Sequence, residues 1–280
     1  PALSLLGVLF MSIAVPFGVL STTGVMAQQW LADSDLPEAK NPYLLFAASN
    51  SGSLIALLGY PLLIEPFLGL TAQRAVWSVA YLGYVALAFS VAPKTTKTSE
   101  APETSEAPQT SEAPEAPEPG SEPESNPTWG TWLYWTLLSA APSTCLLAVT
   151  NVIALDLGSA PLVWVIPLCL YLLTFILIFG PRAWYPQAVR RFWPELTAAG
   201  LLLFLLETQG LHWTGGLVHL GVLFLVCLVG HGELHASRPP PRHLTGFYLA
   251  VSLGGWLGGL FVSLVAPHAF RSLAEYPLSV

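Results

Sequence analysis

Long apolar runs without charged residues alternate with short polar segments along most of this 280-residue chain. The clearest run extends from Leu244 to Ala266 and contains 23 residues without a charge. As an α-helix it would be roughly 35 Å long, at about 1.5 Å per residue. Because the hydrocarbon core of a bilayer is about 30 Å thick, the pattern predicts a transmembrane helix here.

Seven further apolar runs predict seven more spans. A segment inside lipid must satisfy its own backbone hydrogen bonds, which a helix does. We therefore expect an all-α fold, a polytopic transmembrane helical bundle of about eight spans. The earlier spans are expected at Ala2–Met26, Tyr43–Ile64, Ala75–Ala92, Trp129–Leu155, Pro161–Phe179, Leu196–Leu206 and Leu217–Val229.

The polar segment from Lys94 to Pro127 interrupts this pattern. Thr98, Thr104 and Thr110 each begin a Thr-Ser-Glu-Ala-Pro unit, which gives a six-residue repeat with few apolar residues. Such a sequence cannot bury enough apolar surface to fold, so it predicts a disordered Pro/Glu/Ser/Thr linker. The expected organisation is a first transmembrane group at 1–92, the linker at 93–127 and a second transmembrane group at 128–280.

Composition supports a membrane protein. Hydrophobic residues make up 53% and charged residues only 10% of the chain, against about 25% charged residues in ordinary soluble domains. The formal net charge is −7, but eight of the seventeen acidic residues lie in the predicted linker. The remaining chain is close to neutral, so no nucleic acid or other charged macromolecule is expected as a partner.

The three cysteines each lie inside an apolar run, without the spacing of a metal site, and are expected to be inert buried thiols. The sequence opens at Pro1 directly in an apolar run. We therefore expect it to be a fragment of a longer chain.

Arginines indicate the orientation of the bundle. Two loops, at Arg182–Arg191 and Ser237–His243, are separated by two expected spans and so lie on one side of the membrane. Arginine-rich loops face the cytoplasm in most membrane proteins. The segment Glu207–Trp213 is then expected in the periplasm, and the linker in the cytoplasm.

Small residues form two rows on neighbouring faces of the Leu244 span. Gly254 and Gly258 belong to one row, and Gly255 and Gly259 to the other. Small residues at four-residue spacing let helices approach closely in lipid. A helix-packing seam and a substrate path lined by glycine backbone are the two interpretations.

His231-Gly-Glu-Leu-His235 carries the most concentrated candidate chemistry. Two histidines four residues apart can share a metal ion, but Glu233 lies on another face and the spacing is not that of zinc proteases. No metal site is predicted; a structural polar cluster and a substrate or proton site stay open. Glu233 lies close to hydrocarbon and therefore needs a partner, or else it receives a cationic substrate. Arg238 is the first candidate partner, and the others are Arg242, His243 and the Tyr248 hydroxyl.

Asn50 and Asp156 complete the candidate substrate-binding residues. Asn50 lies in a polar run at the centre of the second span, where such groups bond neighbouring helices or line a polar pocket. Asp156 ends the fourth span and is either a capping carboxylate or a proton or cation site.

Three segments carry a resemblance to a known family: Pro16–Leu70, Pro161–Phe179 and the stretch from His231 to Leu278, which begins HGELHASRPPPRH. Their amino-acid sequences resemble the membrane-embedded region of bacterial spermidine-synthase-like membrane proteins, which join a major-facilitator-like region to a spermidine synthase domain. The sequence departs from that pattern at Gly230, where the family has a cysteine before His-Gly-Glu-Leu.

The resemblance implies a multi-pass protein of the bacterial inner membrane. It also implies a module that anchors or serves an aminopropyltransferase-like domain. That enzyme needs a soluble nucleotide-binding sheet with a glycine-rich loop, which this sequence lacks. We therefore expect no catalytic residue and no cofactor in these residues. A transporter of a small solute, such as an amine, is the alternative function.

Overall fold

The structure of the chain, a computed structural model, describes residues 10–91, 126–157, 164–206 and 213–269, together with positions 4, 7 and 8. Within these ranges every regular element is a helix, as the sequence predicts. The predicted linker at 93–127 falls almost wholly outside the described residues. So does the predicted periplasmic segment, apart from Trp213.

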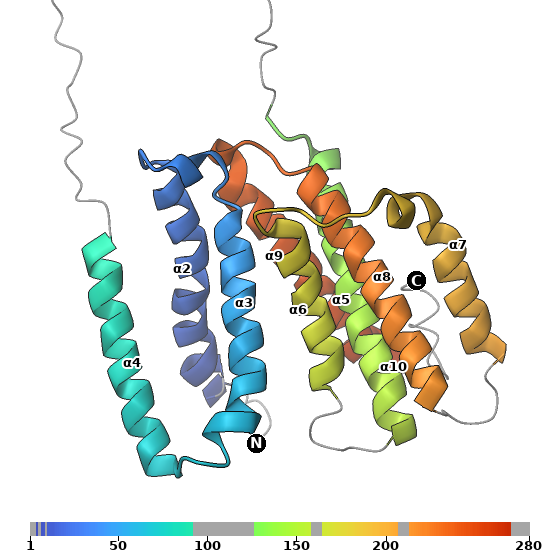
Figure 1. Cartoon of the computed structure of the whole chain (residues 1–280), viewed down its shortest axis with the longest axis horizontal. Helices are drawn as coiled ribbons and strands as arrows, with labels where there is room; N and C mark the ends of the chain where they lie inside the picture. The colour runs from blue at the N-terminus through green and yellow to red at the C-terminus, as the bar shows by residue number, and fades with distance from the viewer. Residues whose placement is uncertain are drawn as a thin grey trace, which may run out of the picture.

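The helices lie side by side and run alternately up and down, so that every second connection lies at the same end of the bundle (Figure 1). The N-terminal part contains η1 (Phe10–Ala14), α2 (Val15–Ala32), η2 (Pro37–Lys40), α3 (Leu44–Gly59), η3 (Tyr60–Ile64) and α4 (Leu70–Val91). The C-terminal part contains α5 (Trp129–Leu157), α6 (Val165–Phe179), α7 (Gln187–Leu206), α8 (Trp213–Ala236), η4 (Pro241–His243), α9 (Leu244–Leu260), η5 (Phe261–Val265) and α10 (Ala266–Ala269).

Five helices among the described residues are long and apolar enough to cross a membrane, which makes this a multi-pass membrane protein. They are Leu44–Ile64, Leu70–Val91, Trp129–Ala154, Gly215–Ala236 and Pro241–Ala269. Helix α6 is apolar but has only 15 residues, and α7 begins with a polar turn that includes Arg190 and Arg191. The eight-span count therefore stays a prediction.

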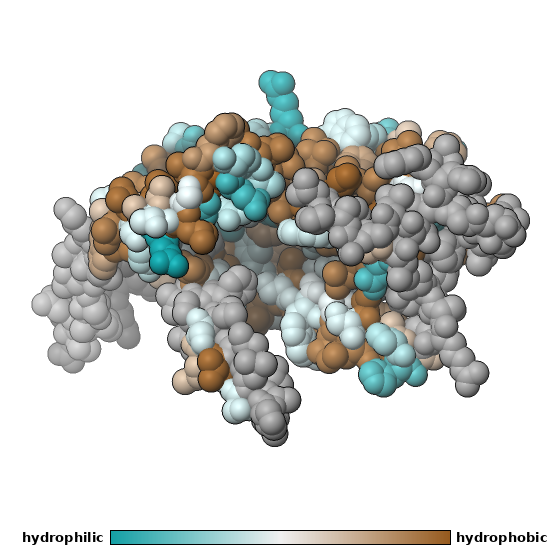
Figure 2. All heavy atoms as spheres, turned by 90° about the horizontal axis from the view of Figure 1, so that it is seen from below, coloured by the Kyte–Doolittle hydropathy of each residue, from teal (hydrophilic) through white to brown (hydrophobic). Residues whose placement is uncertain are grey.

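Helix α5 lies at the centre of the packed region, between α9 and α8. One core cluster joins Trp135 of α5 to Phe247 of α9 and Leu228 of α8, and a second surrounds Cys145 and Leu223. All of these side chains are buried. Many large apolar side chains are also exposed on the outside of the bundle, and apolar residues are visible around its rim when the molecule of Figure 1 is seen from below (Figure 2). That outer surface suits contact with lipid.

Helices α5 and α9 approach each other closely at Gly254 and Gly258. A methyl group on Gly254 would overlap the backbone oxygen of Thr136, and one on Gly258 would lie 2.6 Å from the backbone oxygen of Ala140. A methyl group on Gly255 or Gly259 would make only ordinary contacts, at 3.5 Å or more. The row that contains Gly254 and Gly258 therefore faces α5, and its lack of side chains lets the two backbones meet.

Candidate functional site

Basic residues gather at one end of the bundle, where α2 leads into α3, α6 into α7 and α8 into α9 (Figure 1). Among the described residues, Lys40, Arg182, Arg190, Arg191, Arg238 and Arg242 lie at or near this end, whereas Arg74 lies near the start of α4 at the other. We call it the basic end. The His231–His235 segment, in the last turns of α8, leads into it.

His231 points into the interior of the bundle. Its side chain is completely buried, and its Nδ1 lies 2.9 Å from the Thr174 hydroxyl of α6. The imidazole stacks on the Phe175 ring, with the centroids 3.5 Å apart. Its Nε2 is buried without a hydrogen-bond partner among the described residues. One nitrogen of this ring is thus satisfied and the other is left to a water, a proton or a ligand.

Glu233 faces the start of α7 instead. Its Oε1 lies 3.4 Å from Nε of Arg190 and accepts a hydrogen bond of 3.1 Å from the Tyr185 hydroxyl. The prediction of Arg238 as the first candidate partner of Glu233 is therefore wrong. The pKa of Tyr185 is raised to about 12, mainly because the side chain is partly buried and secondly because the Glu233 carboxylate lies beside it. The phenol is therefore a neutral hydrogen-bond donor at physiological pH.

Arg238 is instead held by its own turn. Its Nη1 donates to the backbone oxygen of His235 at 2.7 Å and to Nδ1 of the same residue at 3.0 Å. The guanidinium also lies over the Tyr43 ring, with its central carbon 5.7 Å from the ring centroid. These contacts fix the arginine at the point where α8 ends.

Hydrogen bonds from two helices fix the connection between α8 and α9. The Tyr43 hydroxyl, at the start of α3, donates to the backbone oxygen of Pro239 at 2.6 Å. The Trp135 indole of α5 donates to the backbone oxygen of Ser237 at 3.2 Å. The proline-rich connection is thereby attached to both helical groups.

Two glycines in the HGEL region make room for neighbours. A methyl group on Gly230 would lie 2.6 Å from Cγ of Pro142, which lies inside α5. One on Gly232 would lie 2.8 Å from the Tyr185 ring, which carries the hydroxyl that contacts Glu233. At Gly230, where the resembled family has a cysteine, a side chain could enter only if Pro142 or the helices moved.

The other two predicted site residues lie elsewhere. Asn50 is half-buried, and its side-chain amide donates to the backbone oxygen of Phe46 in its own helix. Asp156 lies in the last turn of α5, at the end opposite Glu233, and its side chain is outside the described residues. Within the described ranges, no hydrogen bond or ion pair joins Asn50 to His231 or Glu233.

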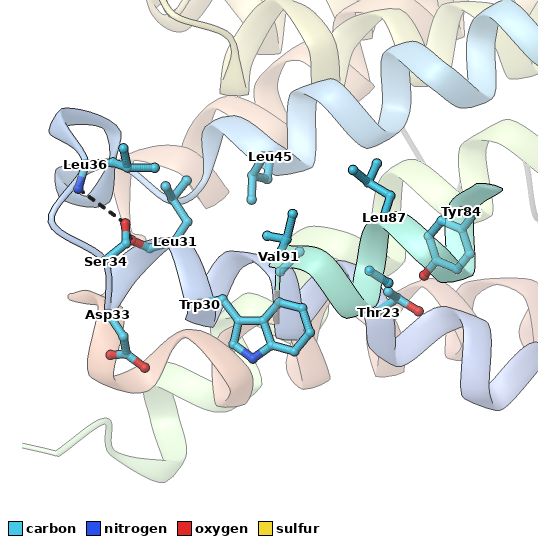
Figure 3. Close-up of a pocket in the computed structure, with 12 residues that line it drawn as sticks. Thr23, Trp30, Leu31, Asp33, Ser34, Leu36, Leu45, Tyr84, Leu87 and Val91 are labelled. Carbon is cyan, nitrogen blue, oxygen red and sulfur yellow. Dashed lines mark hydrogen bonds between the residues drawn. The ribbon is translucent and has the colours of Figure 1, made fainter. Parts of the chain in front are cut away.

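An apolar cavity of about 580 Å³ lies between α2, α3 and α4 (Figure 3). Trp30 and Leu31 of α2, Leu45 of α3, and Leu87 and Val91 of α4 line it. Volumes of about 300–1,000 Å³ are usual for small-molecule sites. Its mainly apolar walls suit a hydrocarbon chain better than a polyamine.

Sequence reasoning missed most of the partners just described. Arg190 and Tyr185, which contact Glu233, are distant from it in the sequence. Tyr43 and Trp135, which bond to the α8–α9 connection, are likewise distant from that connection in the sequence. Aromatic residues next to helix ends were the available signal, because such residues anchor helices at the membrane interface. No group of three or more metal-ligating side chains is placed to hold an ion anywhere in the described ranges.

Comparison with protein-family models, with curated proteins and with solved structures finds no match to this chain.

Proposed function

We propose that this chain is the integral membrane module of a spermidine-synthase-like membrane protein of the bacterial inner membrane. In this proposal it anchors or serves an aminopropyltransferase-like domain at its basic end, which faces the cytoplasm. Helices α2, α6 and α7 complete the eight spans, the first of them extended by η1. The proposed family is supported by the sequence resemblance alone. The proposed orientation is supported by the gathering of basic residues at one end of the bundle.

The fixed α8–α9 connection is the observation that favours an anchoring role. Hydrogen bonds from Tyr43 and Trp135 hold its backbone from two sides. A connection held in one conformation offers a partner a preformed surface, and so reduces the entropy cost of binding. Glu233, in the last turns of α8 before this connection, is already engaged by Arg190 and Tyr185.

Co-sedimentation tests the anchoring role. A separately expressed spermidine-synthase-like domain should sediment with inside-out membrane vesicles that contain this chain. It should sediment far less with right-side-out vesicles or with inside-out vesicles lacking the chain. Tyr43→Phe together with Trp135→Phe removes both hydrogen bonds to the connection and should weaken this association. Equal sedimentation with and without the chain would show that it anchors no such domain.

Transport of a small amine is the second candidate, and one buried polar atom favours it. Nε2 of His231 is buried without a hydrogen-bond partner among the described residues. Unsatisfied polar groups inside a membrane bundle are costly, and often mark a path for a solute or proton. Spermidine uptake into proteoliposomes, lost in His231→Asn at unchanged melting temperature, would support transport; no uptake by the wild type would exclude this solute.

A further inference from the structure

A polar hollow at the basic end lies between the α2–α3 connection and the α8–α9 connection. Its volume is about 370 Å³. Lys40 and Asn41 line one side, and Arg238 and three consecutive prolines, Pro239–Pro241, line the other. Tyr43, whose hydroxyl bonds to Pro239, joins the two sides.

The hollow is positively charged. Lys40 and Arg238 are its only ionisable lining residues apart from Tyr43 among those described, and no acid lines it. Prolines have no backbone N–H, so the hydrogen-bond donors come mainly from the side chains of Lys40, Asn41 and Arg238. Such a set of donors suits an oxyanion.

Arg238 is oriented before any ligand binds. Its Nη1 is occupied by His235, and its guanidinium is held over the Tyr43 ring. Nη2 and Nε have no hydrogen-bond partner among the described residues, and guanidinium groups bind phosphate oxygens through such paired donors. Lys40 is exposed, so its ammonium group can add a second, movable positive charge.

The depth of the hollow matches the lipid headgroups. Lys40 precedes the span that begins at Leu44 by four residues, and Arg238 precedes the one that begins at Pro241 by three. These short segments are turn or coil, so at no more than about 3.6 Å per residue Lys40 lies within about 14 Å of its apolar segment. Arg238 also follows the span that ends at Ala236 by two residues, which places it within about 7 Å of that span. The headgroup layer extends about 5–8 Å beyond the hydrocarbon core on each side.

We propose that this hollow binds the headgroup phosphate of an anionic phospholipid, with Arg238 as the fixed ligand and Lys40 as the second cation. Asn41 contributes its amide, and the rings of Pro239–Pro241 contact the apolar part of the headgroup region. The lipid then bridges the two connections that Tyr43 already joins. Its role is to tie the N-terminal helices to the α8–α9 pair.

Lipid binding to the purified full chain in detergent tests this proposal. The probe is fluorescent phosphatidylglycerol, with unlabelled phosphatidylglycerol, phosphatidylcholine and inorganic phosphate as competitors. Removing one cation at an anionic lipid surface weakens binding by about fivefold. Lys40→Gln should therefore raise the Kd about fivefold, and Lys40→Arg should restore it. Arg182→Gln is the matched control, because it removes an exposed cation at the same end but outside the hollow.

Phosphatidylglycerol should displace the probe, whereas phosphatidylcholine and inorganic phosphate at equal concentration should not. Arg238→Gln should weaken binding further, but this residue also contacts His235 and Tyr43, so the decision rests on exposed Lys40. An unchanged Kd in Lys40→Gln would overturn the site. An equal loss in Arg182→Gln would also overturn it, since attraction would then be diffuse. Displacement by inorganic phosphate alone would overturn the lipid assignment in favour of a soluble anion.

Discussion

The contacts of Glu233 illustrate how burial determines the energetic contribution of a charged contact. The carboxylate is three-quarters buried, with its side chain 25% exposed, whereas the Arg190 side chain is 64% exposed. Exposed ion pairs contribute about 1 kcal/mol or less, because water and salt screen them. The Tyr185 hydrogen bond comes from a half-buried group and does not depend on the charge of Arg190. The tyrosine is therefore expected to matter at least as much as the arginine.

Substitutions at this trio should have small, unequal effects. Arg190→Gln should lower the stability by about 1 kcal/mol or less, and Tyr185→Phe by about 1–2 kcal/mol, because it removes a hydrogen bond to a charged group. Glu233→Gln should make a further Arg190→Gln substitution nearly neutral. Melting temperatures in detergent, combined in a double-mutant cycle, measure this coupling. Coupling of Glu233 to Arg238 instead of Arg190 would contradict the contacts described.

Gly230 offers a second test at the scale of single residues. Gly230→Cys, which introduces the residue of the resembled family, places its side chain against Pro142 and should cost about 1–3 kcal/mol. Gly221→Ala on the same helix is the control. Nothing lies within 4 Å of an added methyl group there, and alanine favours a helix over glycine by about 1 kcal/mol. If Gly230→Cys melts at or above the wild-type temperature, α5 and α8 are further apart than described.

Helix packing was only partly predictable from the sequence. The apolar run at Leu244–Ala266 is confirmed as helical, in α9, η5 and the first residue of α10, because 23 uncharged residues leave few alternatives in lipid. Spacing also predicts two glycine rows. It cannot say which row faces a neighbour, because that depends on α5, more than a hundred residues earlier in the chain. The partner of Glu233 was missed for the same reason.

The α5–α9 contact supplies the prediction at the scale of elements. Gly254→Ala or Gly258→Ala should push the helices apart, because each methyl group would meet the α5 backbone. Gly255→Ala and Gly259→Ala should be tolerated, since their methyl groups would lie at ordinary contact distances. Melting temperatures in detergent compare the four variants. If Gly259→Ala proves more damaging than Gly258→Ala, then the other row faces α5.

At the scale of the whole molecule, the bundle is unevenly packed. Helices α5, α8 and α9 share buried cores, whereas α4 has no buried residue and exposes Trp77, Leu82 and Phe89. A membrane supplies the apolar surroundings that such a helix needs. The sequence could predict that α4 is apolar. It could not predict that α4 would lie at the edge, because an edge span and a central span have the same composition.

The basic end determines the last prediction, which concerns orientation. Arg182 and Arg74 are both exposed and lie at opposite ends of the bundle. In a variant without the three native cysteines, Arg182→Cys should react with an impermeant maleimide only after the cells are permeabilised. Arg74→Cys should react in intact spheroplasts. The physical reason is that basic segments are retained on the cytoplasmic side during insertion, and among the described residues six cations gather at the Arg182 end against one at the other.

Labelling of Arg182→Cys in intact spheroplasts, with Arg74→Cys protected, would reverse the orientation and place the fixed α8–α9 connection outside the cell. The anchoring proposal would then fail, because a cytoplasmic domain could not reach that connection. The phosphate site would survive the reversal, since its depth relative to the lipid headgroups is the same in either leaflet.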